Sequence, residues 1–128
     1  VDGHALQIDE LKGTKPTERI DLRGERLGVA SAFIIASCIK ENGVLKELDL
    51  ERNWFGAEGA TAIAAVLKET KITDLNLGGN DIGDEGVTAL DAILNETSIT
   101  NLDLRRNNLG PKGGAALAEG IKGNSTLQ

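Results

Sequence analysis

The stretch that decides the fold is LKELDLERNWFG, residues 45–56, because it returns twice at a fixed interval. It reappears as ITDLNLGGNDIG at residues 72–83 and as ITNLDLRRNNLG at residues 99–110, so the three starts are 27 residues apart. A weaker copy begins at Thr17, 28 residues before Leu45. Self-similarity at one period of this length predicts stacked copies of a single supersecondary unit.

Each copy opens with a pattern typical of a short strand followed by a turn. Leu48 and Leu50 are two positions apart, so they point to one side of a strand and the residue between them points to the other. An asparagine follows each strand, where its amide group can satisfy backbone groups that the turn leaves open. We therefore expect a buried ladder of Asn53, Asn80 and Asn107, followed by turns at Gly56, Gly83 and Gly110.

The second half of each copy predicts a helix. Gly59, Ile63, Val66 and Leu67 share one helical face, and the same spacing returns at residues 86–94 and 113–121. The leading glycine is expected to let the helix approach the sheet closely. Cys38 falls at a corresponding core position, which indicates a small buried hydrophobic residue rather than a nucleophile.

The L-x-x-L-x-L-x-x-N-x-L pattern, present three times, resembles that of leucine-rich repeat proteins. A strand and a full helix in a unit of 27 or 28 residues are similar to the ribonuclease-inhibitor subclass, which includes the sensor arms of NOD-like receptors and the GTPase-activating protein of the Ran system. The resemblance covers residues 17–128. It implies an α/β solenoid, a right-handed horseshoe segment with a parallel sheet on the concave side and helices on the convex side.

The repeats set the expected domain organisation. Residues 17–128 form the repeat domain, with repeats at about 17–44, 45–71, 72–98 and 99–126 and the start of a fifth at 127. Residues 1–16 are either an N-terminal capping helix or a truncated repeat, and the truncated repeat is preferred. Because no polar cap follows the last repeat, we expect a longer array and possible self-association through the open C-terminal edge near Leu102 and Leu104.

Composition argues against several functional classes. The chain has 14 Lys and Arg against 20 Asp and Glu, a formal charge of -6, which disfavours nucleic acid and anionic membranes as partners. Cys38 and His4 are each the only residue of their type, so they form neither a disulfide nor a cysteine and histidine zinc site. The glycine-rich residues 78–86 lack a lysine for phosphate binding. We expect no cofactor, no metal, no enzymatic activity and a cytoplasmic location.

The concave sheet face is the expected binding surface, since solenoids of this kind present it to partners. Its neighbouring columns carry mixed charge, so a face of solvated internal ion pairs is the alternative. Trp54 shares a column with polar residues, which predicts an exposed ring at the rim, either as an interface anchor or packed on a neighbouring coil. The predicted partner-binding residues are Asp21, Arg23, Glu47, Asp49, Glu51, Arg52, Trp54, Asp74, Asn76, Asp103, Arg105 and Arg106.

The leading functional interpretation is a noncatalytic module that binds another protein through the concave face and adjacent loops. The resemblance to a GTPase activator implies an alternative, in which Arg23, Arg52 or Arg106 acts on a nucleotide site of a partner. A structural segment of a larger sensor or cytoskeletal protein is the third interpretation.

Overall fold

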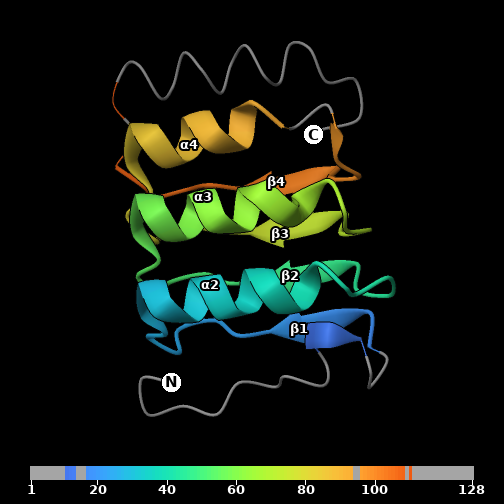
Figure 1. Cartoon of the computed structure of the whole chain (residues 1–128). Coiled ribbons are helices and arrows are strands. Elements are labelled where there is room, and N and C mark those ends of the chain that lie inside the picture. The colour runs from blue at the N-terminus through green and yellow to red at the C-terminus, as the bar shows by residue number, and fades with distance from the viewer. Residues whose placement is uncertain (1–10, 14–16, 94–95, 109, 111–128) are drawn as a thin grey trace.

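Strands and helices alternate along the chain in a computed structural model that describes residues 11–13, 17–93, 96–108 and 110. The elements are β1 (Arg19–Asp21), α2 (Gly28–Ile39), β2 (Glu47–Asp49), α3 (Gly56–Leu67), β3 (Asp74–Asn76), α4 (Gly83–Asp91) and β4 (Asn101–Asp103). The strands are parallel and pair in chain order, β1-β2-β3-β4. Figure 1 shows the three helices stacked in one layer over one side of the sheet. The predicted α/β solenoid is confirmed.

The sheet register follows the sequence period. Leu48 of β2 pairs with Ile20 of β1 and Leu75 of β3, and Leu75 pairs with Leu102 of β4. Equivalent residues of successive repeats therefore lie side by side, so each position of the repeat becomes a column across the sheet. The leucine column faces the helices and is largely buried, as with Leu48 at 1% exposure.

The core between sheet and helices is aliphatic, with Phe55 as its largest fully buried side chain. Cys38 is buried as predicted, and burial raises the pKa of its thiol, which disfavours the reactive thiolate. Leu11 also belongs to the core, and its carbonyl accepts a hydrogen bond from Asn42 Nδ2 at 3.0 Å. Residues 1–10 and 14–16 of the predicted N-terminal segment, and the expected helix at 113–121 with the fifth start at 127, lie outside the described residues.

The helix-entry glycine is required by a close approach, but not by the approach to the sheet that the sequence predicted. A Cβ added at Gly59 of α3 would lie 2.9 Å from the Cβ of Ala32 in α2 and 2.8 Å from the Cβ of Phe55. The close neighbours belong to the preceding helix and to the turn before α3. Glycine at this position therefore lets adjacent coils stack tightly.

The asparagine ladder is confirmed, and it joins neighbouring coils. Asn53 Nδ2 donates to the carbonyls of Leu22, one repeat earlier, and Leu50 in its own repeat, at 2.8 and 3.0 Å. The backbone N–H of Asn53 donates to Asn80 Oδ1 at 2.8 Å, and that of Asn80 donates to Asn107 Oδ1 at the same distance. Each asparagine thus satisfies buried backbone groups of two coils at once.

Candidate functional site

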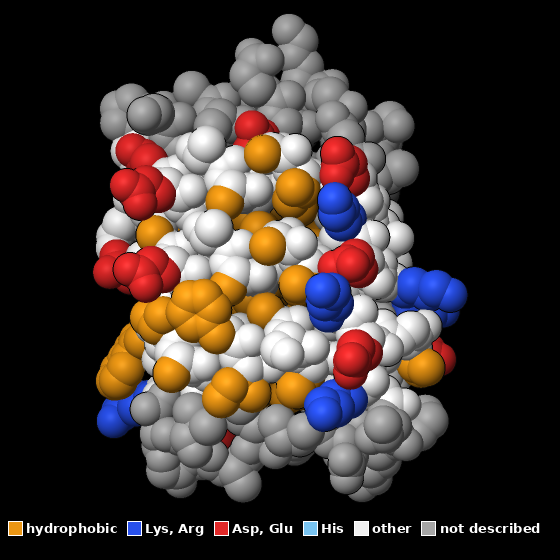
Figure 2. Space-filling view, viewed as in Figure 1, with side chains coloured by type: hydrophobic (Ala, Val, Ile, Leu, Met, Phe, Trp, Pro, Cys, Tyr) orange, Lys and Arg blue, Asp and Glu red, His pale blue; other side chains and the backbone are white. Residues whose placement is uncertain are grey.

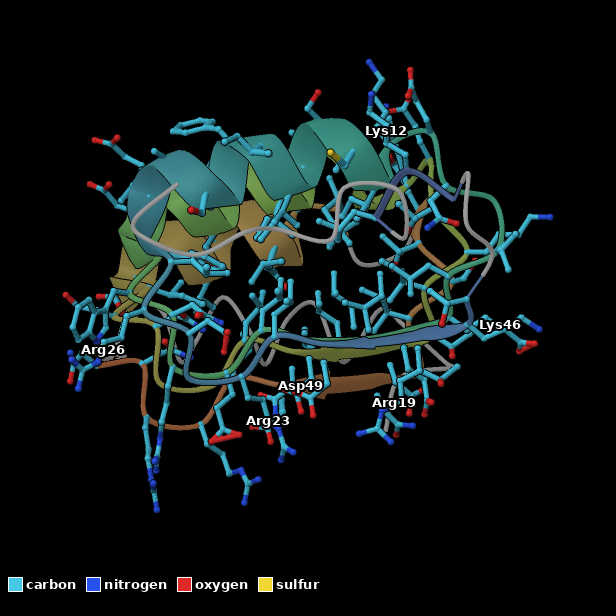
Figure 3. The ribbon with its side chains drawn as sticks, turned by 90° about the horizontal axis from the view of Figure 1, so that it is seen from below. Lys12, Arg19, Arg23, Arg26, Lys46 and Asp49 are labelled. Carbon is cyan, nitrogen blue, oxygen red and sulfur yellow. The ribbon has the colours of Figure 1, made fainter. Side chains whose placement is uncertain are left out.

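The side of the sheet opposite the helices is open to solvent. We call it the open face and define it by the strand residues at positions 19, 21, 47, 49, 74, 76, 101 and 103. Figure 3 shows Arg19, Arg23 and Asp49 pointing away from the helix layer on this side. A hollow of about 530 Å³ lies on the open face, and the predicted site residues that line it are Glu47, Asp49, Asp74, Asn76, Asp103 and Arg105.

The central column of the open face has a structural role besides any role in binding. Asp21, Asp49, Asn76 and Asp103 each accept a hydrogen bond through Oδ1 from the backbone N–H two residues later, at 3.1, 3.2, 2.9 and 3.0 Å respectively. This side-chain turn closes the end of every strand. Aspartate and asparagine are interchangeable as acceptors, so the column can change its charge from repeat to repeat without losing the turn.

Two arginines neutralise most of the charge in this column. Arg105 Nη2 lies 2.7 Å from Asp103 Oδ2, and the hydrogen bond from Arg105 lowers the pKa of Asp103. Arg23 Nη2 lies 2.9 Å from Asp21 Oδ2, and its hydrogen bond lowers the pKa of Asp21.

Asp49 differs because it is more deeply placed. Its Oδ2 lies 3.4 Å from Arg23 Nε, yet burial is the dominant influence and raises the pKa of Asp49. Asp49 is therefore the carboxylate of this column whose charge is least compensated.

A second group of charged side chains lies just beyond the carboxyl ends of the strands. A hollow of about 190 Å³ is lined there by Glu51, Arg52, Gly78, Gly79, Asp103, Arg105 and Arg106. A shallower one is lined by Asp21, Arg23, Gly24, Glu51 and Arg52. Together the three hollows include every predicted partner-binding residue except Trp54. Arg106 has no ion-pair partner within the part of the chain that the structure describes.

Trp54 is exposed as predicted, but it lies away from the open face. Its side chain is 59% exposed, and the guanidinium of Arg26 lies 5.4 Å from the ring centroid. In Figure 3, Arg26 is at the edge where the chain turns from the sheet toward the helices. The ring therefore remains accessible and also contacts Arg26 of the preceding repeat, while its role as an interface anchor stays a prediction. The backbone of Trp54 has a φ of 60°, a conformation that bulky residues rarely adopt.

The predicted partner-binding residues do not include several residues of this surface. Arg19 and Asn101 line the large hollow together with Glu47 and Asp74, and these four residues form one column of the sheet. Their shared position in the repeat was the signal that identifies them. On the helix side, Figure 2 shows charged side chains along the two edges and small or apolar groups over the centre. Phe33 of α2 is 50% exposed on its helix.

The described residues contain no group of three or more His, Cys, Asp or Glu side chains arranged to hold a metal ion. A membrane-spanning helix would need a longer apolar stretch than any helix in the described ranges has.

Comparisons with known proteins agree with this architecture. A family model described as "Leucine Rich repeat" matches residues 42–64, 68–90 and 95–118, together more than half of the chain. No curated protein matches the chain. A solved structure of "Leiomodin-1 Actin-Binding Site 2 (ABS2)" is similar with a TM-score of 0.81 and 25% sequence identity, over 94% of this chain and 73% of that chain. The chain belongs to the leucine-rich repeat family.

Proposed function

We propose that this chain is a noncatalytic protein-interaction module that binds its partner through the open face and the loops beside it. The observation that carries the proposal is the open face itself, a polar surface across four strands with a hollow of about 530 Å³. Leucine-rich repeat folds cover one side of the sheet with helices and leave the other for a partner.

Variation between repeats supports the same proposal. The column that pairs Arg19, Glu47, Asp74 and Asn101 changes from positive to negative to neutral along the sheet. The neighbouring inward column stays aliphatic throughout, because it must fill the core. A scaffold alone needs only polar residues on the outer column, whereas a specific charge pattern suits recognition of a partner of complementary pattern.

Actin is the first partner to test, because the similar leiomodin structure is named as an actin-binding site. We expect fluorescence anisotropy with labelled monomeric actin, or co-sedimentation with filaments, to detect binding. Glu47→Lys reverses an exposed charge in the large hollow, and Glu69→Lys makes the same charge change at an exposed position after α3. The first substitution should weaken binding at least about threefold and the second should leave it unchanged.

The outcomes separate the parts of the proposal. Equal affinities for the two variants would show that the bound partner does not use the open face. No binding by the unmodified chain would exclude actin as the partner.

A GTPase-activating role makes a different prediction, since it requires a faster rate of GTP hydrolysis by a small GTPase. A binding module leaves that rate unchanged when the chain is added. Self-association through the sheet edge at β4 stays a separate prediction. Light scattering across a concentration series tests it, and a constant monomer mass would contradict it.

A further inference from the structure

We propose that the hollow of about 190 Å³ beyond the ends of β2, β3 and β4 binds a carboxylate side chain of the protein partner. We call this hollow the arginine notch, and its lining residues are Glu51, Arg52, Gly78, Gly79, Asp103, Arg105 and Arg106. The inference rests on the proposed function, because the carboxylate belongs to a protein that binds the open face. It adds the chemistry of one contact.

The notch exists because one repeat has two glycines where its neighbours have large side chains. Gly78 and Gly79 occupy the places taken by Glu51 and Arg52 one repeat earlier. A Cβ at Gly79 would lie 3.0 Å from Arg52 Cγ, and a Cβ at Gly78 would lie 3.1 Å from Asn76 Oδ1. Any longer side chain at these positions would therefore fill the space.

The walls of the notch carry an excess of positive charge. Three arginines line it against two carboxylates, which leaves one positive charge uncompensated. Arg105 Nη2 and Nε are engaged by Asp103, and Arg52 Nε lies 3.7 Å from Glu51 Oε2. Arg106 has no ion-pair partner among the described residues, and its side chain is exposed. Arg52 and Arg106 belong to the coils before and after the glycine pair, and both line the notch.

The donors in the notch favour a carboxylate over a phosphate. The backbone N–H groups of the glycine floor are already used, since Gly78 N–H donates to Asn76 Oδ1 and Gly79 N–H donates to the carbonyl of Arg105, both at 2.9 Å. The floor therefore lacks the free N–H groups that cradle phosphate in glycine-rich loops. Guanidinium groups bind carboxylates in planar, bidentate geometry, and a single excess positive charge matches a singly charged group.

A peptide titration followed by NMR tests the notch without any partner protein. The probe is acetyl-Gly-Glu-Gly-Glu-Gly-amide, and its controls are the same peptide with glutamine in place of glutamate and inorganic phosphate. We expect saturable shifts of the Gly78 and Gly79 amide resonances with the glutamate peptide and binding about fivefold weaker with the glutamine peptide. Equal binding of the two peptides, or tighter binding of phosphate, would overturn the proposal.

Two pairs of variants show whether the notch is the site. Gly79→Asn fills the notch without changing charge, and Gly83→Asn is its match because both glycines have a φ of +65° and Gly83 has nothing within 4 Å of an added Cβ. Asparagine tolerates this backbone conformation, so both variants should fold. Arg106→Gln removes one positive charge from the notch, and Lys68→Gln removes one at the end of α3.

We expect Gly79→Asn to abolish the peptide-induced shifts and Arg106→Gln to weaken binding about two- to fivefold, with both controls unchanged. Unaltered binding by Gly79→Asn would overturn the proposal. The same variants then separate it from the proposed function. A partner that responds to Glu47→Lys but not to Gly79→Asn would leave the function standing and refute the notch. Peptide binding at the notch, with no protein partner bound at the open face, would leave the notch standing and refute the proposed function.

Discussion

Replacing Asn80 by alanine tests whether the asparagine ladder joins the coils. Asn80 is fully buried, and its Oδ1 accepts hydrogen bonds from the backbone N–H groups of Asn53 at 2.8 Å and Phe55 at 3.3 Å. Its Nδ2 donates to the carbonyls of Leu50 and Leu77 at 2.9 and 3.1 Å. Alanine removes the whole amide group and keeps only the backbone N–H that continues the ladder.

The magnitude follows from which partners lose their only hydrogen bond. The Leu50 carbonyl keeps its bond from Asn53 Nδ2, and the Leu77 carbonyl keeps its bond from Asn107 Nδ2. The N–H groups of Asn53 and Phe55 lose their acceptor in a buried environment. An orphaned buried donor costs about 1–3 kcal/mol, so we expect the free energy of unfolding to fall by about 2–4 kcal/mol. Whole domains have only about 5–15 kcal/mol to lose.

Urea unfolding followed by far-UV circular dichroism measures this loss. Asn101→Ala is the control, because Asn101 is exposed and its side chain donates only to the Asp74 carboxylate among the described residues. This substitution should change stability by less than about 0.5 kcal/mol. Asn80→Asp keeps the acceptor but sets a carboxylate against carbonyl oxygens, so this variant should be less stable than Asn80→Ala at pH 7. Its stability should recover at acid pH, where the carboxylate is protonated. A loss below about 0.5 kcal/mol for Asn80→Ala would refute the reasoning.

Further substitutions follow from the packing, the charges and the backbone. Gly59→Ala should destabilise by about 1–3 kcal/mol in thermal unfolding despite alanine's better helix propensity, because its Cβ meets Phe55 and Ala32 of the preceding coil, whereas Gly43→Ala, with open space around it, should be neutral. Asp103→Asn should lose up to about 1 kcal/mol at pH 7, since the lowered pKa of Asp103 contributes stability that disappears only as pH falls below about 4. Asp49→Asn should not lower the free energy of unfolding at pH 7. The raised pKa of Asp49 contributes stability only at acid pH, where the carboxyl is protonated, and this contribution is gone once the group ionises. A loss of stability equal to that of Asp103→Asn would contradict this assignment. Trp54→Asn should stay within about 1 kcal/mol of the unmodified stability, since relief of backbone strain offsets the lost arginine contact, and a larger loss would make the ring structural.

The open face shows how far the sequence could identify the candidate site. Strand alternation placed Asp49 and Asp103 on the side away from the helices, and the structure places them there. The sequence could not separate the two carboxylates, because the difference comes from burial of Asp49 and from the arginine beside Asp103. It also could not reveal that both close the turn after their strand, since an aspartate in a strand pattern carries no mark of its hydrogen-bond partner.

The sequence by itself determined the repeat, its parallel register and its buried columns, because a constant period forces equivalent residues to stack and the apolar ones to face the core. Only the tertiary structure decided how residues one or two repeats apart meet. The contact of Trp54 with Arg26 and the notch between Arg52 and Arg106 both join side chains from different coils. Such contacts depend on the rotamer of each side chain and on the size of its neighbour in the next repeat, and neither follows from periodicity alone.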